Sequence, residues 1–215
     1  KTSVVLTDKV VKGDVCDCII TEGGQFLKIP RNSSDNDLVK RESELIKDCF
    51  SKEPENSKRF LPELIQSARI STPGGERFCN LFTYYTRYGT ERGYSLVEVH
   101  EKYKDLDLRN AAWIFRRILS SLITIHSCGW VHVNLKPENY IIYPETHYGM
   151  LTSFTGAVKS GDKGIIAPGD RSFYSPDLLN KKLLKEGADL YSAAKIMRYL
   201  LGSTPITKRM NGILS

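Results

Sequence analysis

The stretch that decides the fold is HVNLKPEN, residues 132–139. It follows a long segment with helical spacing and precedes the apolar run 140–143, so we expect a loop between a helix and an extended segment. Asn134, Lys136 and Asn139 place polar side chains inside this loop. These three residues are the first candidate site residues.

Two long helices are predicted in the second half of the chain. From Asp107 onward, apolar residues recur at three- and four-residue intervals, which predicts one apolar helix face. The residues of that face are Ala112, Phe115, Leu119, Leu122 and Ile125. The helix should end near residues 128–129, and a second helix is predicted over residues 187–201, with a glycine after its last residue. Residues 131–143 and 148–154 are expected to form short extended or loop segments.

The first part of the chain is predicted to be a β-sheet with one helix. Residues 4–30 contain β-branched segments broken by glycines, which predicts three antiparallel strands. Residues 35–50 have helical spacing, and residues 65–72 and 77–85 predict a further hairpin. The expected fold class is therefore α+β, with a β-rich lobe over residues 1–88 and a mainly helical, short lobe over residues 89–215.

Composition favours a soluble protein of a reducing compartment. Five cysteines are an odd number scattered over 215 residues, which argues against a disulfide framework and for a cytoplasmic location. Cys16 and Cys18 form a lone C-x-C pair, which is a weak zinc signal. Their spacing fits two residues on one face of a strand, which is the expected role. No apolar stretch is long enough to cross a bilayer and the polar start lacks a signal peptide's apolar stretch, so no membrane association is expected. The first residue is not methionine, which leaves open a longer chain.

The charge balance gives little support for nucleic acid as a partner. The chain has 31 basic and 25 acidic residues, for a net charge of +6. Such an excess favours acidic partners, but the basic residues fall inside amphipathic helical patterns without a dense run. Solvated helix faces are the better explanation, although the positive charge leaves nucleic-acid binding open.

The loop at residues 132–139 resembles the catalytic loop of protein kinases, which reads HRDLKPEN in that family. Five consecutive residues, LKPEN at 135–139, match, and so does His132. Residues 132–158 also resemble divergent kinase-like proteins of bacteria and their phages. The resemblance implies a two-lobed kinase-like fold, with an antiparallel sheet and a helix in the first lobe.

Further motifs of the family follow in the expected order, so the resemblance spans essentially the whole chain. Lys28 resembles the strand lysine that contacts nucleotide phosphates, and Glu42 resembles its partner on the helix, with Glu44 as the alternative. The segments SFT, at 153–155, and SPD, at 175–177, stand at the D-F-G and A-P-E positions. Asp189 opens the helix that braces the catalytic loop in kinases.

Two residues that kinases need for phosphoryl transfer are replaced. Asn134 stands where the family has the aspartate that accepts the substrate proton, and Ser153 stands where an aspartate binds magnesium. An amide cannot serve as a general base. General-base catalysis typically raises the rate of a reaction by about 100- to 10,000-fold. That factor corresponds to about 3 to 5 kcal/mol of barrier. A serine hydroxyl is a poor ligand for a hard cation, so no metal site is expected.

Nucleotide binding is also expected to be weakened. The turn that matches the phosphate-covering loop, GDVCDC at 13–18, has one glycine and adds the carboxylates of Asp14 and Asp17, which would repel ATP. Phe26 stands where kinases place a small alanine above the adenine. Its ring is expected to pack on Phe82 or Ile141 and to fill the pocket. No bound cofactor is expected, with weak ATP or magnesium binding as the alternative.

These residues predict a pseudokinase that acts as a binding or regulatory module with a protein partner, with Lys28, Glu42 and Asn139 as structural polar groups. One alternative is an atypical ATP-dependent protein kinase of the serine/threonine type that uses the retained Lys28, Lys136 and Asn139. Another is a scaffold or nucleic-acid-associated protein on a kinase-like fold, because fold alone does not fix function. The expectation is therefore that the chain is not an active enzyme.

Overall fold

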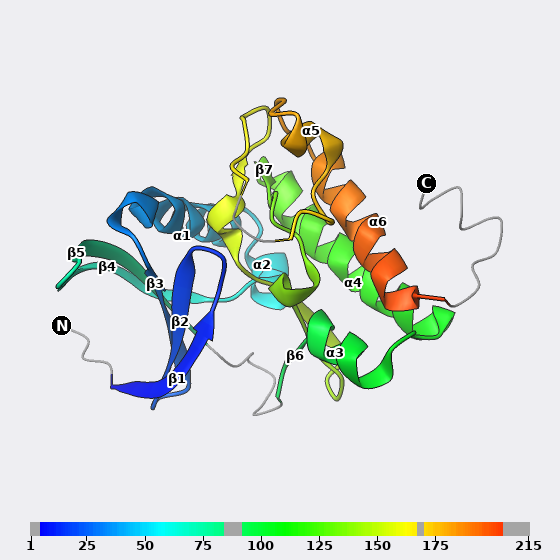
Figure 1. Ribbon diagram of the computed structural model, residues 1–215, viewed down its shortest axis with the longest axis horizontal. Coiled ribbons are helices and arrows are strands. Elements are labelled where there is room, and N and C mark those ends of the chain that lie inside the picture. Colours follow the sequence, from blue (N-terminus) through cyan, green and yellow to red (C-terminus); the bar gives the residue numbers. More distant parts are fainter. Residues whose placement is uncertain (1–4, 84–91, 167–169, 204–215) are drawn as a thin grey trace.

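The computed structural model describes residues 5–83, 92–166 and 170–203. Figure 1 shows two lobes: a β-sheet with one long helix beside it, and a second lobe dominated by helices. The predicted α+β, kinase-like architecture with a short helical lobe is confirmed. The predicted lobe boundary at residues 88–89 lies outside the described residues. Among the described residues, no helix is both long enough and apolar enough to cross a bilayer.

The first lobe is built on a five-stranded antiparallel sheet in the order β1-β2-β3-β5-β4. Its strands are β1 (Leu6–Lys12), β2 (Cys16–Thr21), β3 (Gln25–Pro30), β4 (Leu64–Thr72) and β5 (Gly75–Thr83). The three predicted N-terminal strands and the later hairpin are therefore present. Because cross-strand partners share a sheet face, the pairing of Phe26 with Ile20 and of Lys28 with Cys18 puts all four on one face.

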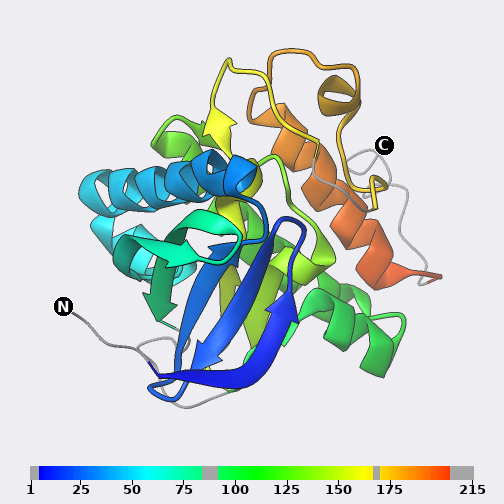
Figure 2. The ribbon, with the colours of Figure 1, turned by 60° about the vertical axis from the view of Figure 1, so that its left-hand side comes forward.

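Two helices accompany this sheet, although the sequence predicted one. The helix α1 (Asn36–Lys52) crosses the sheet in Figure 2 and buries an apolar face that includes Val39, Leu45 and Ile46. A short 3-10 turn, η1 (Ser33–Asp35), precedes it. The unpredicted helix is α2 (Pro54–Phe60), which has proline in its first turn, where the missing N–H costs nothing. Seven residues are too few for helical periodicity to be read from the sequence.

The second lobe contains four helices in its described part. These are α3 (Leu96–Tyr103), α4 (Leu108–Ser127), α5 (Pro176–Leu179) and α6 (Gly187–Leu201). Short strands and 3-10 turns connect them: β6 (Tyr94–Ser95), β7 (Trp130–Val131), η2 (Pro137–Asn139), β8 (Tyr140–Tyr143), β9 (Tyr148–Leu151), η3 (Phe154–Gly156) and β10 (Val158–Lys159). The predicted helix over residues 187–201 is confirmed at both ends.

The buried face of α4 differs from the predicted one. Leu122 and Ile125 are buried as expected, but Ala112, Phe115 and Leu119 are only partly buried. The fully buried positions include Ala111, Ile114, Ile118, Ser121 and Thr124. The reason is that α4 packs against α6, β9 and α2, so its buried face is rotated and includes small hydroxyl residues.

One apolar core joins the two lobes. It contains Ile46 and Phe82 from the first lobe together with Ile118, Leu135 and Phe154 from the second. In Figure 1 the α4 and α6 helices run side by side to the right of the sheet, and α6 carries Asp189, which contacts the loop 132–139. This loop is therefore held between the sheet and the helices, where both lobes can supply side chains to it.

Candidate functional site

The start of the loop 132–139 is fixed by a buried carboxylate on α6. Asp189, which is 0% exposed, accepts hydrogen bonds from the backbone N–H groups of His132 (2.7 Å) and Val133 (2.8 Å). His126 Nε2 lies 2.8 Å from the same carboxylate. Val133 has φ 67°, a left-handed conformation that costs free energy for a β-branched residue. The two N–H bonds to Asp189 hold this turn in place.

His132 contributes structure and no charge to the loop. Its ring is fully buried against Phe154, and its Nε2 lies 2.9 Å from the carbonyl oxygen of Thr152. Burial lowers the pKa of His132, because removal from water disfavours the imidazolium. The neutral ring therefore connects the loop to the strand β9 and the turn that follows it.

Lys28 and Glu42 form the ion pair that the sequence predicted. Their side chains meet at 2.7 Å and are 6% and 2% exposed. Burial works to lower the pKa of Lys28, but the Glu42 carboxylate outweighs it, so the pKa is raised and the ammonium stays charged. The alternative, Glu44, is excluded because it is exposed and lies near Lys40 instead.

Glu42 is itself held by other donors. Its carboxylate accepts hydrogen bonds from the backbone N–H of Phe154 (2.9 Å) and from Asn80 Nδ2 (3.3 Å). The first bond joins α1 to the segment after β9, and the second joins α1 to β5. The pair is thus part of the contact between the lobes.

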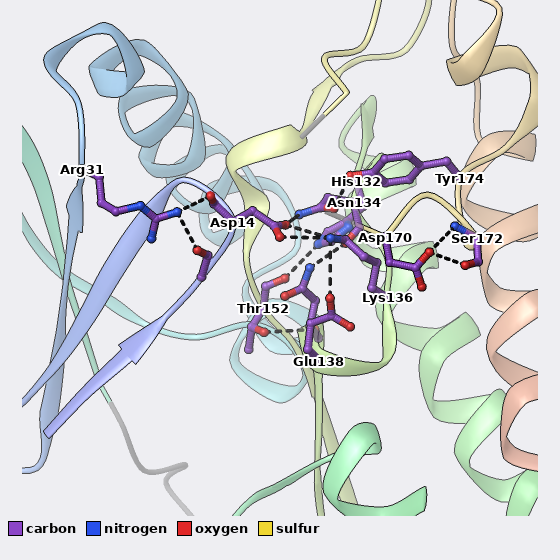
Figure 3. Close-up of polar contacts among 12 residues, drawn as sticks. Asp14, Arg31, His132, Asn134, Lys136, Glu138, Thr152, Asp170, Ser172 and Tyr174 are labelled. Carbon is purple, nitrogen blue, oxygen red and sulfur yellow. Dashed lines mark hydrogen bonds and ion pairs between the residues drawn. The ribbon is translucent and has the colours of Figure 1, made fainter. Parts of the chain in front are cut away.

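Asn134 has both ends of its side-chain amide engaged. Its Nδ2 donates to Asp14 Oδ2 at 2.8 Å, and its Oδ1 accepts from the Tyr174 hydroxyl at 3.1 Å. Figure 3 shows the carboxylate of Asp14 pointing at Asn134 and Lys136 from the opposite lobe. The amide at this position is therefore a connector between the β1–β2 turn and the segment that carries Tyr174.

Lys136 meets the same carboxylate. Its Nζ lies 3.1 Å and 3.0 Å from the two oxygens of Asp14, and 3.5 Å from Glu138. Burial alone would lower the pKa of Lys136. The hydrogen bond to Asp14 and the nearby charges outweigh burial, so the pKa is raised. Since Lys136 is 1% exposed, its charge needs this partner.

Arg31 fixes the turn that carries Asp14. Its guanidinium donates to the carbonyl oxygens of Gly13 (2.9 Å), Asp14 and Cys16 (3.1 Å) and to the carboxylate of Asp17 (3.0 Å). The planar fork of donors suits such a convergent set of acceptors. Figure 3 shows Arg31 and Lys136 on opposite sides of Asp14.

Asn139 and Ser153 stand where the family resemblance places metal ligands. Asn139 donates from Nδ2 to the carbonyl oxygen of Asn134 at 2.8 Å, and so helps to shape the loop. Ser153 has left-handed backbone angles, φ 63° and ψ 64°, and lines the cleft between the lobes. Among the described residues, no group of three or more His, Cys, Asp or Glu side chains is placed to hold a metal ion.

The cleft between the lobes is open, which corrects one prediction. Its volume is about 580 Å³, and its lining includes Phe26, Lys28, Asp14, Asn139 and Ser153. The expected packing of Phe26 on Phe82 is confirmed, with ring centroids 5.1 Å apart, but the ring remains half-buried and does not fill the space. Phe82 follows the same sheet face, so it draws the ring against the sheet and leaves the cleft accessible.

The structure brings the predicted site residues together and adds others. Phe26, Lys28, Glu42, Asn134, Lys136, Asn139 and Ser153 lie in or beside the cleft. Sequence reasoning missed that Asp14 would bind Asn134 and Lys136, and it missed Arg31 and Tyr174. A signal for the Asp14–Lys136 contact existed in the sequence. Asp14 stands in the turn that covers the phosphates in kinases, Lys136 stands in the catalytic loop, and kinases direct both segments at the same phosphates.

Comparisons with known proteins match part of the chain. The family model described as "Protein kinase domain" matches residues 77–213. Serine/threonine-protein kinase ppk21 of Schizosaccharomyces pombe is 29% identical over 121 residues, which are 51% of this chain and 22% of that protein. Calcium-dependent protein kinase 22 of Arabidopsis thaliana is 31% identical over 115 residues, 52% of this chain and 22% of that protein.

A third relative shows the same partial coverage. Calcium/calmodulin-dependent protein kinase type 1 of Macrobrachium nipponense is 31% identical over 100 residues, which are 45% of this chain and 29% of that protein. The chain thus spans less than a third of the length of each of these three relatives.

Proposed function

We propose, from the premise that this chain belongs to the protein kinase domain family, that it is a catalytically impaired member acting as a binding or regulatory module. The observation that carries this proposal is the hydrogen bonding of the Asn134 side chain. Its amide nitrogen donates to Asp14 and its oxygen accepts from Tyr174. An amide in this position cannot remove the proton from an attacking hydroxyl, which an aspartate does in protein kinases.

A second feature supports the same proposal independently. Ser153 keeps the left-handed backbone at the position where kinases hold magnesium, but it offers a neutral hydroxyl there. Magnesium prefers carboxylate oxygen, so any metal bound here would rely on Asn139 and the ligand's own phosphates. We therefore propose that ATP or magnesium binding, where it occurs, is weak.

One observation favours a second candidate function. The Lys28–Glu42 pair is closed at 2.7 Å, which is the arrangement that working kinases require, and the cleft is open. An atypical ATP-dependent protein kinase would use Lys28, Lys136 and Asn139 for this chemistry. Asp14 would then have to leave Lys136 before a phosphate could approach it.

The cellular setting belongs to the proposal as well. A module without phosphotransfer would act through a protein partner, and the five cysteines support a cytoplasmic location because none of them forms a disulfide. The resemblance of residues 132–158 to kinase-like proteins of bacteria and phages supports a source of that kind.

Phosphotransfer is the experiment that tests this function. The chain is incubated with magnesium and γ-labelled ATP, alone and with a general protein substrate, beside Lys28→Ala as the control. We expect no label above that control. The double variant Asn134→Asp with Ser153→Asp should also remain near background, because the turn 13–18 still has one glycine and two carboxylates. Label that wild type incorporates and Lys28→Ala loses would replace the proposal with the atypical kinase.

A further inference from the structure

We infer that Asp14 acts as an internal anion at the end of the cleft beside Asn134 and Lys136, the phosphate end. We infer also that the cleft takes a flat, phosphate-free ligand of nucleoside size. This inference rests on the proposed function, in which ATP binding is weak. It goes further by naming the ligand class. Its basis is the contact between a turn of the first lobe and two buried side chains of the second.

Lys136 and Asn134 together form an oxyanion site. Both are almost completely buried, and both direct N–H donors at one carboxylate group. Lys136 contacts both oxygens of Asp14, and Asn134 contacts one of them. A phosphate group would use the same two donors, since charged and amide N–H groups bind phosphate and carboxylate oxygens alike. While Asp14 is there, the site is filled.

The turn that carries Asp14 is fixed in this position by its own lobe. Arg31 binds three carbonyl oxygens of the turn, and its backbone N–H donates to Val15 O at 3.0 Å. The Gly13 N–H also donates to Cys16 O at 2.9 Å. These bonds are independent of the contact with Lys136, so the turn presents its carboxylate to the second lobe in a fixed shape.

The charges around the cleft do not favour a polyphosphate. Its described lining contains three basic residues, Lys12, Lys28 and Arg92, and three acidic ones, Asp14, Glu98 and Glu138. Lys28 is already paired with Glu42, and Arg92 with Glu98. Asp14 and Glu138 share the single charge of Lys136, so the paired groups around the cleft add no net positive charge for a triphosphate.

The rest of the cleft suits a flat apolar ligand. Its lining includes Val15, Ile20, Phe26, Ile141 and Met150. The Phe26 ring, stacked on Phe82, gives one wall an aromatic surface. A volume of about 580 Å³ lies in the range of small-molecule sites, which are mostly apolar with a few placed polar groups. Such a wall favours a planar aromatic ligand.

Titration calorimetry on the whole chain tests the inference with adenosine and ATP as probes. Wild type should bind adenosine at least about tenfold more tightly than ATP, with or without magnesium. Asp14→Asn keeps the shape of the side chain and removes its charge, so it should strengthen ATP binding by about tenfold and change adenosine binding less than about twofold. Asp8→Asn, the same charge change on an exposed position of β1, should behave as wild type.

The outcomes separate this inference from the proposed function. Wild type that binds ATP as tightly as adenosine, or binds neither, overturns the inference without any variant. An unchanged ratio of ATP to adenosine affinity in Asp14→Asn overturns it as well. Because the labelling assay measures transfer and calorimetry measures binding, tight ATP binding without label would refute the inference and the proposal of weak ATP binding, and would leave the proposed loss of phosphotransfer standing.

Discussion

The two sides of the loop 132–139 are both held by a carboxylate, but the two carboxylates differ in kind. On the side of α6, Asp189 is fully buried and accepts bonds from the backbone of His132 and Val133. On the side of the cleft, Asp14 is 18% exposed and accepts bonds from the side chains of Asn134 and Lys136. The first contact joins elements of one lobe, and the second joins the two lobes.

This difference separates what the fold needs from what the chemistry needs. The Asp189 contact satisfies backbone donors that any chain of this shape must satisfy, whatever its activity. The Asp14 contact satisfies donors that the kinase mechanism would direct at phosphate. The chain has therefore kept the family's pattern on the structural side of the loop and departed from it on the side of the cleft.

The largest effect is expected on the structural side. Asp189→Ala leaves two buried backbone N–H groups and His126 without their acceptor, so it should lower the free energy of unfolding by about 3 to 5 kcal/mol. Urea unfolding followed by circular dichroism measures this change. The control, Asp177→Ala, removes an exposed pair with Lys182 and should cost less than about 0.5 kcal/mol. A similar small loss for both variants would refute the structural role of Asp189.

The Lys28–Glu42 pair of the first lobe should rank second. Lys28→Met leaves the buried Glu42 carboxylate without its cation and should cost about 3 kcal/mol. Adding Glu42→Gln removes the unpaired charge and keeps an acceptor for Phe154, so the double variant should recover at least about 1 kcal/mol. Urea unfolding of the three variants and wild type measures the difference. Additive losses would show that the pair is not coupled in solution.

Phe26 should have a smaller effect than a core phenylalanine. Phe26→Ala removes a half-buried ring stacked on Phe82 beside an open cleft, so the loss should be about 1 to 2 kcal/mol. Truncating a fully enclosed phenylalanine typically costs about 3 to 5 kcal/mol. A thermal unfolding series that includes Phe154→Ala gives the enclosed reference. Equal losses for the two variants would mean that the cleft is closed in solution.

The charge of Asp48 should contribute about 1 kcal/mol to the free energy of unfolding, and this contribution should depend on pH. Burial alone would raise its pKa, but hydrogen bonds from Lys159, Lys52 and Trp130 outweigh it and lower the pKa from 3.8 to about 2. The stabilisation is therefore complete above pH 4 and lost as the pH falls toward 2. Because Asp48 is 25% exposed, the effect is reduced by solvent.

Asp48→Asn should thus be less stable than wild type at pH 7 by about 1 kcal/mol. The two proteins should become similar as the pH falls through about 2, the pKa at which the carboxyl group of wild type takes up its proton. Unfolding measured at several pH values checks both statements. A difference that stays constant across this range would rule out the titration of Asp48 as its cause.

The sequence predicted the elements that follow periodicity or a family motif. The helix over residues 187–201 and the Lys28–Glu42 pair were predicted correctly, because glycine punctuation and motif order specify them locally. The seven-residue helix α2 and the rotated face of α4 were not, because they depend on which neighbours pack against them. Contacts across long sequence separations, such as Asp14 with Lys136, leave no periodic signal.

Phe26 also shows that a motif in the sequence does not fully determine how a side chain packs. Its substitution for a small residue was visible in the sequence, and so was its place facing the cleft. Its packing on Phe82, the cross-strand neighbour on β5, was also expected, but the open space that this packing leaves in the cleft was not. A motif identifies which residue is unusual, whereas packing decides what the residue does.

The central claim is that Asp14 closes the phosphate end of the cleft from inside, and a double-mutant cycle between Asp14 and Lys136 tests it most directly. Unfolding free energies are measured for wild type, Asp14→Asn, Lys136→Met and the double variant. The contact predicts a coupling energy of about 1 to 2 kcal/mol, because the lysine is buried and its ion pair is only partly exposed to water. A coupling below about 0.3 kcal/mol would contradict the claim, since independent sites add within that range.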